Sequence, residues 1–190
     1  MAAASNLTHI LLCGGAISEW ASTNSDEWRA RIELVATAAH NGGAAWATII
    51  PNGDGSEADA ELIRERLVTS CDGVRYAERV VVLARNGVTV IVDPLADGQA
   101  RIAKVAARVT TSEVSEQHLG AAVSAPAPGE PDLVIVLGSA TTLPRSLVWE
   151  LAYAEIVFFD APWRSLDAEH LEMSIDDFTR RDRRFGGVDS

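Results

Sequence analysis

Short apolar runs alternate with helical patterns along most of this 190-residue chain. Each run is bounded by turn-forming residues and is shorter than an ordinary helix, which is typical of a buried strand. The expected strands are His9–Cys13, Ala45–Ile50, Val88–Val92 and Leu133–Leu137. Strands that alternate with helices pair in parallel. The sequence therefore predicts one α/β domain over residues 1–190, with a parallel sheet between helices on both faces.

The expected helices carry an apolar stripe or a capping signal. One stripe recurs at helical spacing in Trp28, Ile32, Val35 and Ala39. Ser56 and Asp59 match a capping box, which predicts a helix that extends to about Thr69. Three further helices are expected over Gln99–Val109, Leu147–Glu155 and Asp167–Arg184.

Other segments are less regular. Val80–Ala84 fits either a strand or the buried side of a helix, and Val157–Phe159 predicts a short strand. Ala121–Pro131 is rich in Pro and Ala and is expected to be a mobile loop. We also expect residues 1–7 and 188–190 to be flexible.

Charge and motifs exclude several classes of function. The formal net charge of −11 argues against a nucleic-acid partner. The two cysteines have no CxxC or Cys/His neighbour, which argues against zinc and disulfide sites. Gly14-Gly15 follows a strand but is not GxGxxG, and the chain has no P-loop or GxSxG motif. No apolar run reaches membrane-spanning length, so a cytoplasmic location is expected.

The last third of the chain carries the most specific pattern. Its characteristic residues are Pro131-Asp132-Leu133, the run LVWELAYAE over Leu147–Glu155, Asp160, Trp163, and RRFGG over Arg183–Gly187. These residues resemble the cis-prenyltransferase family, the undecaprenyl diphosphate synthases and their relatives. The resemblance implies that family's fold and an Mg²⁺-dependent condensation of isopentenyl diphosphate with an allylic diphosphate.

A weaker resemblance extends to the first expected strand. His9–Ala21 aligns without gaps on the family motif HxAxIMDGNGRWA. On that alignment Gly15 stands where the family has the aspartate that holds Mg²⁺ on the diphosphate, and Glu19 replaces an arginine. Glycine has no side chain to ligate a metal ion, and a glutamate repels phosphate. The resemblance therefore implies a disabled metal site.

The other diphosphate-binding positions also depart from the family pattern. Gly87–Ile102 keeps the framework of a second motif, but its YGGR becomes residues 96–99, ADGQ. The two arginines that clamp pyrophosphate are replaced by Val136 and Thr142, and Arg145 lies off register. The short stretch between Pro51 and Val88 implies a shortened fold with fewer walls for a prenyl chain.

Two elements keep residues suited to binding a diphosphate or a metal ion. Arg184 and Gly186 form the RxG tail, which in this family closes the active site of the partner subunit. The alternative is a basic last helical turn that complements the helix dipole. Glu155 matches a family carboxylate near the metal and is a weaker candidate metal ligand. Its alternative role is to maintain the fold.

These features predict a non-catalytic accessory subunit of a heterodimeric cis-prenyltransferase. It would stabilise a catalytic homologue and supply Arg184 and Gly186 in trans. It would have no cofactor of its own, while the partner would hold Mg²⁺ and the isoprenoid diphosphates, with membrane proximity through the lipid product. The expected interface residues are Trp149, Tyr153, Ile156 and Phe158. The alternatives are a homodimeric scaffold and a prenyltransferase with altered chemistry.

Overall fold

The computed structural model describes residues 7–108, 115–139, 142–152 and 154–185, and the side chains of residues 182–185 are outside this description. The segments expected to be flexible, 1–7 and 188–190, lie outside the described residues except for Leu7, which is buried. In the described part of the chain, no helix is both long and apolar enough to span a membrane.

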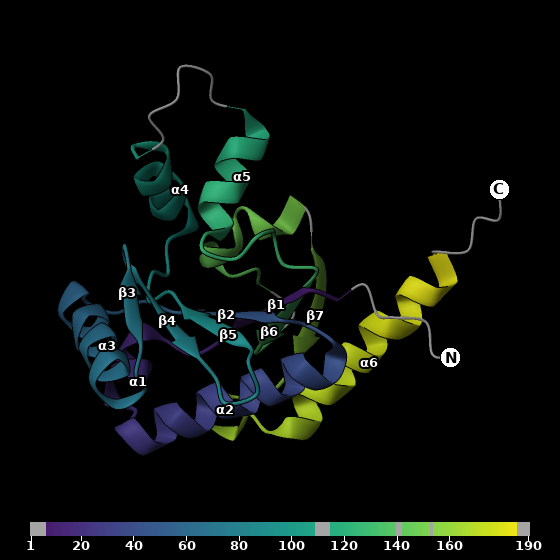
Figure 1. Cartoon of the computed structure of the whole chain (residues 1–190), viewed down its shortest axis with the longest axis horizontal. Helices are drawn as coiled ribbons and strands as arrows, with labels where there is room; N and C mark the ends of the chain where they lie inside the picture. Colours follow the sequence, from purple (N-terminus) through teal and green to yellow (C-terminus); the bar gives the residue numbers. More distant parts are fainter. Residues whose placement is uncertain (1–6, 109–114, 140–141, 153, 186–190) are drawn as a thin grey trace.

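A seven-stranded sheet with the order β3-β4-β5-β2-β1-β6-β7 forms the centre of the fold (Figure 1). Its strands are β1 (His9–Cys13), β2 (Trp46–Ile50), β3 (Val74–Tyr76), β4 (Arg79–Leu83), β5 (Thr89–Val92), β6 (Leu133–Leu137) and β7 (Glu155–Phe159). All neighbours are parallel except β3–β4 and β4–β5. The predicted α/β class is confirmed, and Val80 to Leu83 of the ambiguous segment belong to the antiparallel strand β4.

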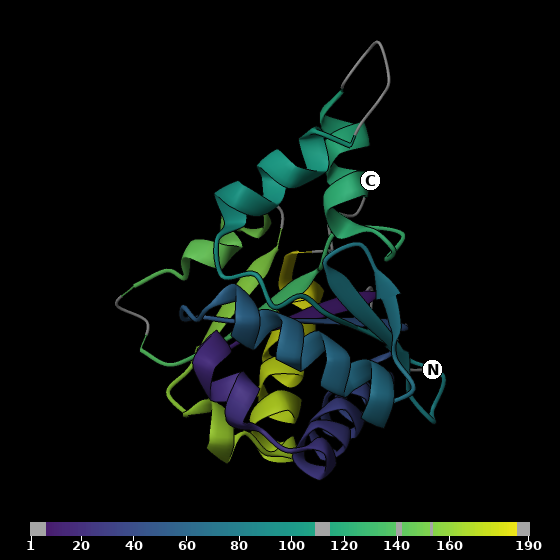
Figure 2. The ribbon, with the colours of Figure 1, turned by 90° about the vertical axis from the view of Figure 1, so that its left-hand side faces the viewer.

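Helices cover both faces of this sheet, as Figures 1 and 2 show. The α-helices are α1 (Ile17–Ser22), α2 (Ser25–Gly42), α3 (Glu57–Ser70), α4 (Gly98–Ala106), α5 (Glu116–Ser124) and α6 (Ala168–Phe185). Short 3-10 turns are η1 (Arg145–Leu147), η2 (Glu150–Ala152) and η3 (Trp163–Ser165). The α3 capping box is present as predicted, because Ser56 Oγ accepts from Asp59 N while the Asp59 carboxylate accepts from Ser56 N.

The larger core lies between the sheet and helices α1, α2, α3 and α6. The predicted stripe of α2 is buried in it. Trp20, Trp28 and Trp163 form an aromatic cluster within this core, with ring centroids 5.2 to 6.1 Å apart. Offset and edge-on aromatic pairs at such separations add stability beyond their buried area. The cluster fixes the chain just after β1, where the family motif departs from its pattern.

The opposite face of the sheet has a smaller apolar core of β1, β2 and β6 side chains with Leu147. Ile156 and Phe158 of β7 pack against it and are only partly buried. Helices α4 and α5 lie side by side on this face (Figures 1 and 2).

Two predictions of secondary structure were wrong. Leu147–Glu155 is not an α-helix, since its described residues form only short 3-10 turns and Glu155 already pairs with Leu133 as the first residue of β7. Ala121–Pro131 is not entirely a loop, because α5 extends to Ser124 and begins where Ser115 Oγ accepts from His118 N. In the first case strand pairing overrides local apolar periodicity. In the second, the N-cap begins a helix that ends just before Pro126.

Candidate functional site

In open sheets of this kind, ligands bind beyond the carboxyl ends of the parallel strands. Here those ends lead into the loops around Gly15, Asn52, Asp97 and Gly138. This is also the edge at which the family resemblance places metal and diphosphate. The candidate site therefore lies in these loops.

The loop after β1 is tied to the loop after β2 by backbone hydrogen bonds. Asn52 N donates to Gly15 O over 2.8 Å, and Ile17 N donates to Gly53 O over 3.1 Å. Gly14 N donates to Ile50 O over 3.0 Å. These N–H groups already have partners, so they cannot form the open cradle that binds a phosphate.

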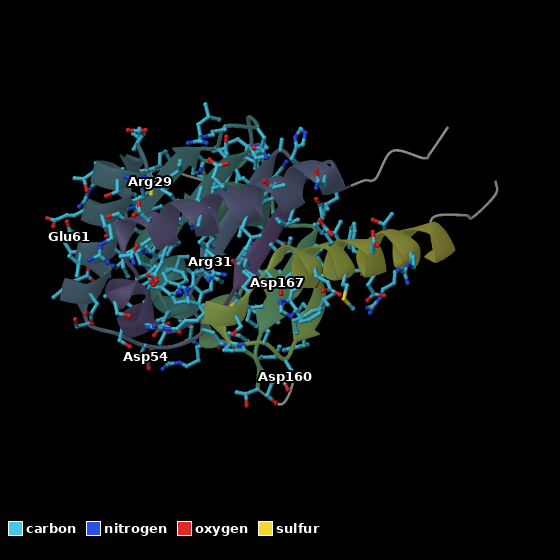
Figure 3. The ribbon with its side chains drawn as sticks, turned by 90° about the horizontal axis from the view of Figure 1, so that it is seen from below. Arg29, Arg31, Asp54, Glu61, Asp160 and Asp167 are labelled. Atoms are coloured by element: carbon cyan, nitrogen blue, oxygen red, sulfur yellow. The ribbon has the colours of Figure 1, made fainter. Side chains whose placement is uncertain are left out.

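Gly15 occupies a position that no side chain can share. Its φ is +73°, and a Cβ on this residue would lie 2.7 Å from Trp20 Nε1 and 2.8 Å from Trp163 Cγ. Trp163 also contacts Arg31, which is labelled in Figure 3 and whose guanidinium carbon lies 4.6 Å from the ring centroid. A carboxylate cannot be accommodated here without displacing the aromatic cluster.

Glu19, which stands at a family arginine position, has a partner within the chain. Its Oε1 accepts from Arg164 Nε over 3.1 Å, and Arg164 also donates to Ser22 Oγ over 2.9 Å. The Arg164 side chain of this pair is largely exposed, whereas that of Glu19 is partly buried. The local charge is balanced, and this position presents no free cation to a phosphate.

The structure places the residues at the third expected diphosphate position as follows. Val136 is buried within β6, whereas Thr142 is exposed. Arg145, the off-register arginine, pairs with Asp97 at 3.1 Å, and both side chains are exposed. Asp97 in turn caps α4 by accepting from Ala100 N. Among the residues that the structure describes, no three His, Cys, Asp or Glu side chains come together to hold a metal ion.

The candidate metal ligand Glu155 lies at the opposite end of the strands. It is the first residue of β7 and pairs with Leu133, which pairs with Ile10 near the start of β1. Gly15 lies beyond the other end of β1. One carboxylate oxygen of Glu155 is buried and has no hydrogen-bond partner in the described part of the chain.

The structure describes the RxG tail and the four expected interface residues only in part. The backbone of Arg184 belongs to the last turn of α6, but its side chain, Gly186 and Tyr153 lie outside the described residues. Ile156 and Phe158 lie on one face of the edge strand β7, and Trp149 Nε1 donates to Glu130 Oε1 over 2.7 Å. Ile156 and Phe158 thus share the face of β7 that packs against the smaller core.

A buried charged cluster near the ends of β4 and β5 was not predicted. Arg79 Nε donates to Asp93 Oδ2 over 2.9 Å, and Arg101 donates to Glu150 Oε1 over 2.7 Å. Burial raises the pKa of Glu150 above its ordinary value. A sequence signal existed, because Arg79 and Asp93 directly flank two apolar runs and Arg101 follows the start of an amphipathic helix.

Comparisons with known proteins agree with the motif resemblance. A family model described as "Putative undecaprenyl diphosphate synthase" matches residues 77–186, more than half of the chain. "Isoprenyl transferase 2" of Bradyrhizobium diazoefficiens is 40% identical over 75 residues, which cover 40% of this chain and 30% of that protein.

Two further similarities cover more of the chain. "Ditrans,polycis-undecaprenyl-diphosphate synthase ((2E,6E)-farnesyl-diphosphate specific)" of Lactiplantibacillus plantarum is 33% identical over 127 residues, 62% of this chain and 45% of that protein. The matches thus span less than half the length of these curated relatives. A crystal structure of a probable undecaprenyl diphosphate synthase from Campylobacter jejuni superposes with a TM-score of 0.60 at 18% identity. The superposition covers 95% of this chain and 99% of the Campylobacter chain, which shows that the two share a fold.

Proposed function

Because this chain belongs to the undecaprenyl diphosphate synthase family of prenyltransferases, we propose that it is a non-catalytic accessory subunit of a heterodimeric cis-prenyltransferase. Its partner is a catalytically complete homologue that condenses isopentenyl diphosphate with an allylic diphosphate. The observation that carries the proposal is Gly15. It stands at the family's metal-binding aspartate and has no room for a side chain between Trp20 and Trp163.

Mg²⁺ belongs to the partner in this proposal. The residues of this chain do not fit the ion, since Gly15 offers no ligand and no cluster of three ligating side chains occurs in the described ranges. In the partner, the metal would offset charge on the departing pyrophosphate. This chain contributes Arg184 and Gly186 from its C-terminal tail. An arginine beside a flexible glycine N–H suits a diphosphate anion.

The edge strand β7 and the segment before it support the proposed interface. Ile156 and Phe158 are only partly buried, and nearby Val148 and Leu151 are 42% and 40% exposed. Apolar side chains of this kind form the centre of subunit contacts. This surface, with Trp149, would contact the catalytic homologue, and Tyr153, also expected there, lies outside the described residues. The complex would be cytoplasmic and lie near a membrane through its lipid product.

A pull-down of the tagged chain from its native source tests the pairing. We expect recovery of a homologue that keeps the aspartate and both arginines of the family motifs. In that complex, Arg184→Ala should lower the rate of prenyl transfer by at least about tenfold while the complex stays intact. The matched control is Arg180→Ala, an exposed arginine one helical turn earlier that lies 3.9 Å from Asp176.

Two outcomes would contradict the proposal. Recovery of homodimers alone would favour a scaffold. An unchanged rate for Arg184→Ala would remove the role of the tail in trans.

A further inference from the structure

Part of the sheet has an apolar face that is open to solvent. Alternation along β4 directs Val80 and Val82 into the larger core, on the side of α3. The same alternation turns Val81 and Leu83 to the opposite face, where Leu83 is 72% exposed and Val81 is partly exposed. The smaller core on that face is formed by β1, β2 and β6 with Leu147, so among the described residues it does not extend to β4.

The edge strand β3 adds two exposed apolar side chains to this face. Val74 pairs directly with Val81 and is 68% exposed, and Tyr76, two residues further along β3, is 45% exposed. Directly paired residues share a face of a sheet. The sheets of α/β proteins are normally covered on both faces, so an exposed apolar area of this kind indicates a contact surface. It is called the open strip below and consists of Val74, Tyr76, Val81 and Leu83.

Both ends of the open strip carry charged side chains. Arg85 directly follows β4, is exposed, and forms no ion pair with the residues that the structure describes. Asp72 is exposed at the same end, two residues before β3. At the other end Glu78 precedes β4 and lies 3.8 Å from Arg64 and 3.1 Å from Arg108. The Glu78 side chain is still 36% exposed, so it can accept a further partner.

We propose that the open strip binds the open strip of a second copy of this chain, about a two-fold axis that crosses β4. Such an axis makes the two β4 strands antiparallel, so Arg85 of each copy lies over Glu78 of the other and Leu83 lies over Val81. An axis along β4 would instead oppose Arg85 to Arg85 and Glu78 to Glu78. Like charges in contact are unfavourable, so the charges select the antiparallel arrangement.

The remaining charges at the ends of the strip fit the same arrangement. Asp72 lies at the Arg85 end, whereas Lys104 and Arg108 line the cavity beside Glu78. Antiparallel contact therefore brings Asp72 of each copy toward the cations of the other. Because both copies use the same surface, the contact closes as a dimer and leaves no strip free for further chains.

The width of the open strip sets the strength of the contact. Adjacent strands lie about 4.8 Å apart, so a surface across β3 and β4 is narrow and belongs among the interfaces that bury less than about 1,200 Å² in total. We therefore expect a dissociation constant on the order of 10 µM. β3 and β7 are the two edges of the sheet, so this dimer leaves β7 accessible and does not depend on the accessory-subunit role.

Sedimentation velocity of the purified full chain at about 1–200 µM tests the dimer. Salt at about 0.15 M screens the net charge of −11 on each copy. We expect a shift from monomer to dimer as the concentration rises. Leu83→Glu should weaken the dimer at least about 100-fold, because it places a charge at the centre of the contact. The matched control is Leu62→Glu, at a 42% exposed leucine of α3, and it should leave the dimer unchanged.

Charge reversal tests the orientation of the two copies. Arg85→Glu and Glu78→Arg should each weaken self-association about tenfold, because each variant brings like charges together at two symmetric contacts. An equimolar mixture of the two variants should regain the parental affinity, since both contacts then join opposite charges. Glu78 also pairs within the chain, so the thermal unfolding midpoint of Glu78→Arg checks its fold. If that variant is unfolded, Leu83→Glu and Arg85→Glu decide the test.

Three results would overturn the proposal. The first is a chain that stays monomeric up to about 200 µM. The second is a dimer that Phe158→Glu dissociates and Leu83→Glu leaves intact, because its contact would lie at β7. The third is a mixture of folded Arg85→Glu and Glu78→Arg chains that associates no better than either variant alone, which would contradict the antiparallel arrangement.

Discussion

Gly15 lies so close to Trp163 that a Cβ on residue 15 would come within 2.8 Å of the indole Cγ. Trp163 packs against Trp20 with a centroid separation of 5.2 Å, and Trp20 Nε1 donates to Gly14 O over 3.0 Å. The loop that would present a metal ligand in the family is thus closed by aromatic packing. The aromatic core leaves no room for a side chain at residue 15, so substituting this residue alone would not create a metal ligand there.

Substitution of Gly15 should destabilise the folded protein for two separate reasons, its left-handed backbone and the lack of space for a side chain. Gly15→Ala adds left-handed strain and a steric clash, so we expect it to lower the free energy of unfolding by about 2–4 kcal/mol. Gly87→Ala, at φ +87° with open space around it, should cost only about 1 kcal/mol. Gly129→Ala, which has open space and no positive φ, should stay within about 0.5 kcal/mol of the parent. Urea unfolding measures all three, and equal costs for Gly15→Ala and Gly87→Ala would refute the steric part.

The Arg101–Glu150 pair should be sensitive to removal of one partner. Both side chains are almost completely buried, and their nitrogen and oxygen lie 2.7 Å apart. Arg101→Met leaves a buried carboxylate uncompensated, which should cost about 3–5 kcal/mol. The double change with Glu150→Met should recover most of that loss. A double variant as unstable as Arg101→Met would show that the pair is not the cause.

The exposed pair of Arg145 and Asp97 provides the matched comparison for the buried one. Their separation is 3.1 Å, with side-chain exposures of 74% and 41%. Arg145→Met should change the free energy of unfolding by about 0–1 kcal/mol, because solvent screens such pairs. A loss as large as that of Arg101→Met would argue against burial as the source of the difference.

His9 should make stability depend on pH below 6.5. Its Nδ1 lies 3.0 Å from Gly129 O and its Nε2 lies 2.8 Å from Thr48 Oγ1, and burial lowers its pKa below the ordinary value of 6.5. The unfolded state therefore takes up a proton first as the pH falls. The contribution of neutral His9 to the free energy of unfolding is fully present above pH 6.5. It declines as the pH falls below 6.5, by at most about 1.4 kcal/mol per pH unit.

Urea unfolding at pH 7.5 and 5.5 checks this dependence. His9→Gln should flatten the difference between the two pH values. His118→Gln removes an exposed histidine of α5 and should leave the difference unchanged. An identical pH dependence in the parent and in His9→Gln would disprove the assignment.

The proposed interface predicts a selective effect at β7. Phe158→Glu would place a charge on the partly buried face of the edge strand, and we expect it to weaken the pairing with the homologue by at least about 100-fold. Leu83→Glu changes a side chain of β4 that is 72% exposed, at the other side of the sheet. It should leave the affinity unchanged. Analytical ultracentrifugation of the two-protein mixture distinguishes the variants. If only Leu83→Glu dissociates the complex, the interface does not lie at β7.

Local sequence patterns predicted the parts of the fold that depend on neighbouring residues, such as a helical apolar stripe or a helix cap. The α2 stripe was found because each of its members is buried against the sheet. The boundary of α3 was found because the Ser56 cap is local in sequence. Leu147–Glu155 was misassigned because pairing of Glu155 with Leu133 is a long-range contact that periodicity cannot show.

The site was harder to predict than the fold. Gly15 could be identified as a lost ligand from its motif, but the indole rings that exclude a side chain come from Trp20 and from Trp163, far along the chain. The cluster of Arg79, Asp93, Arg101 and Glu150 joins four separate segments of the chain. Each residue looked like an ordinary charged side chain at the end of an element, and only the tertiary fold brings them together.

Turnover by the chain alone tests the central claim most directly. The purified protein would be incubated with Mg²⁺, isopentenyl diphosphate and an allylic diphosphate, and incorporation of the isopentenyl unit would be measured with and without the catalytic homologue. The account predicts no prenyl transfer by the chain alone, and a higher rate for the pair than for the homologue alone. Turnover by the chain alone, above that of a heat-denatured sample, would contradict it.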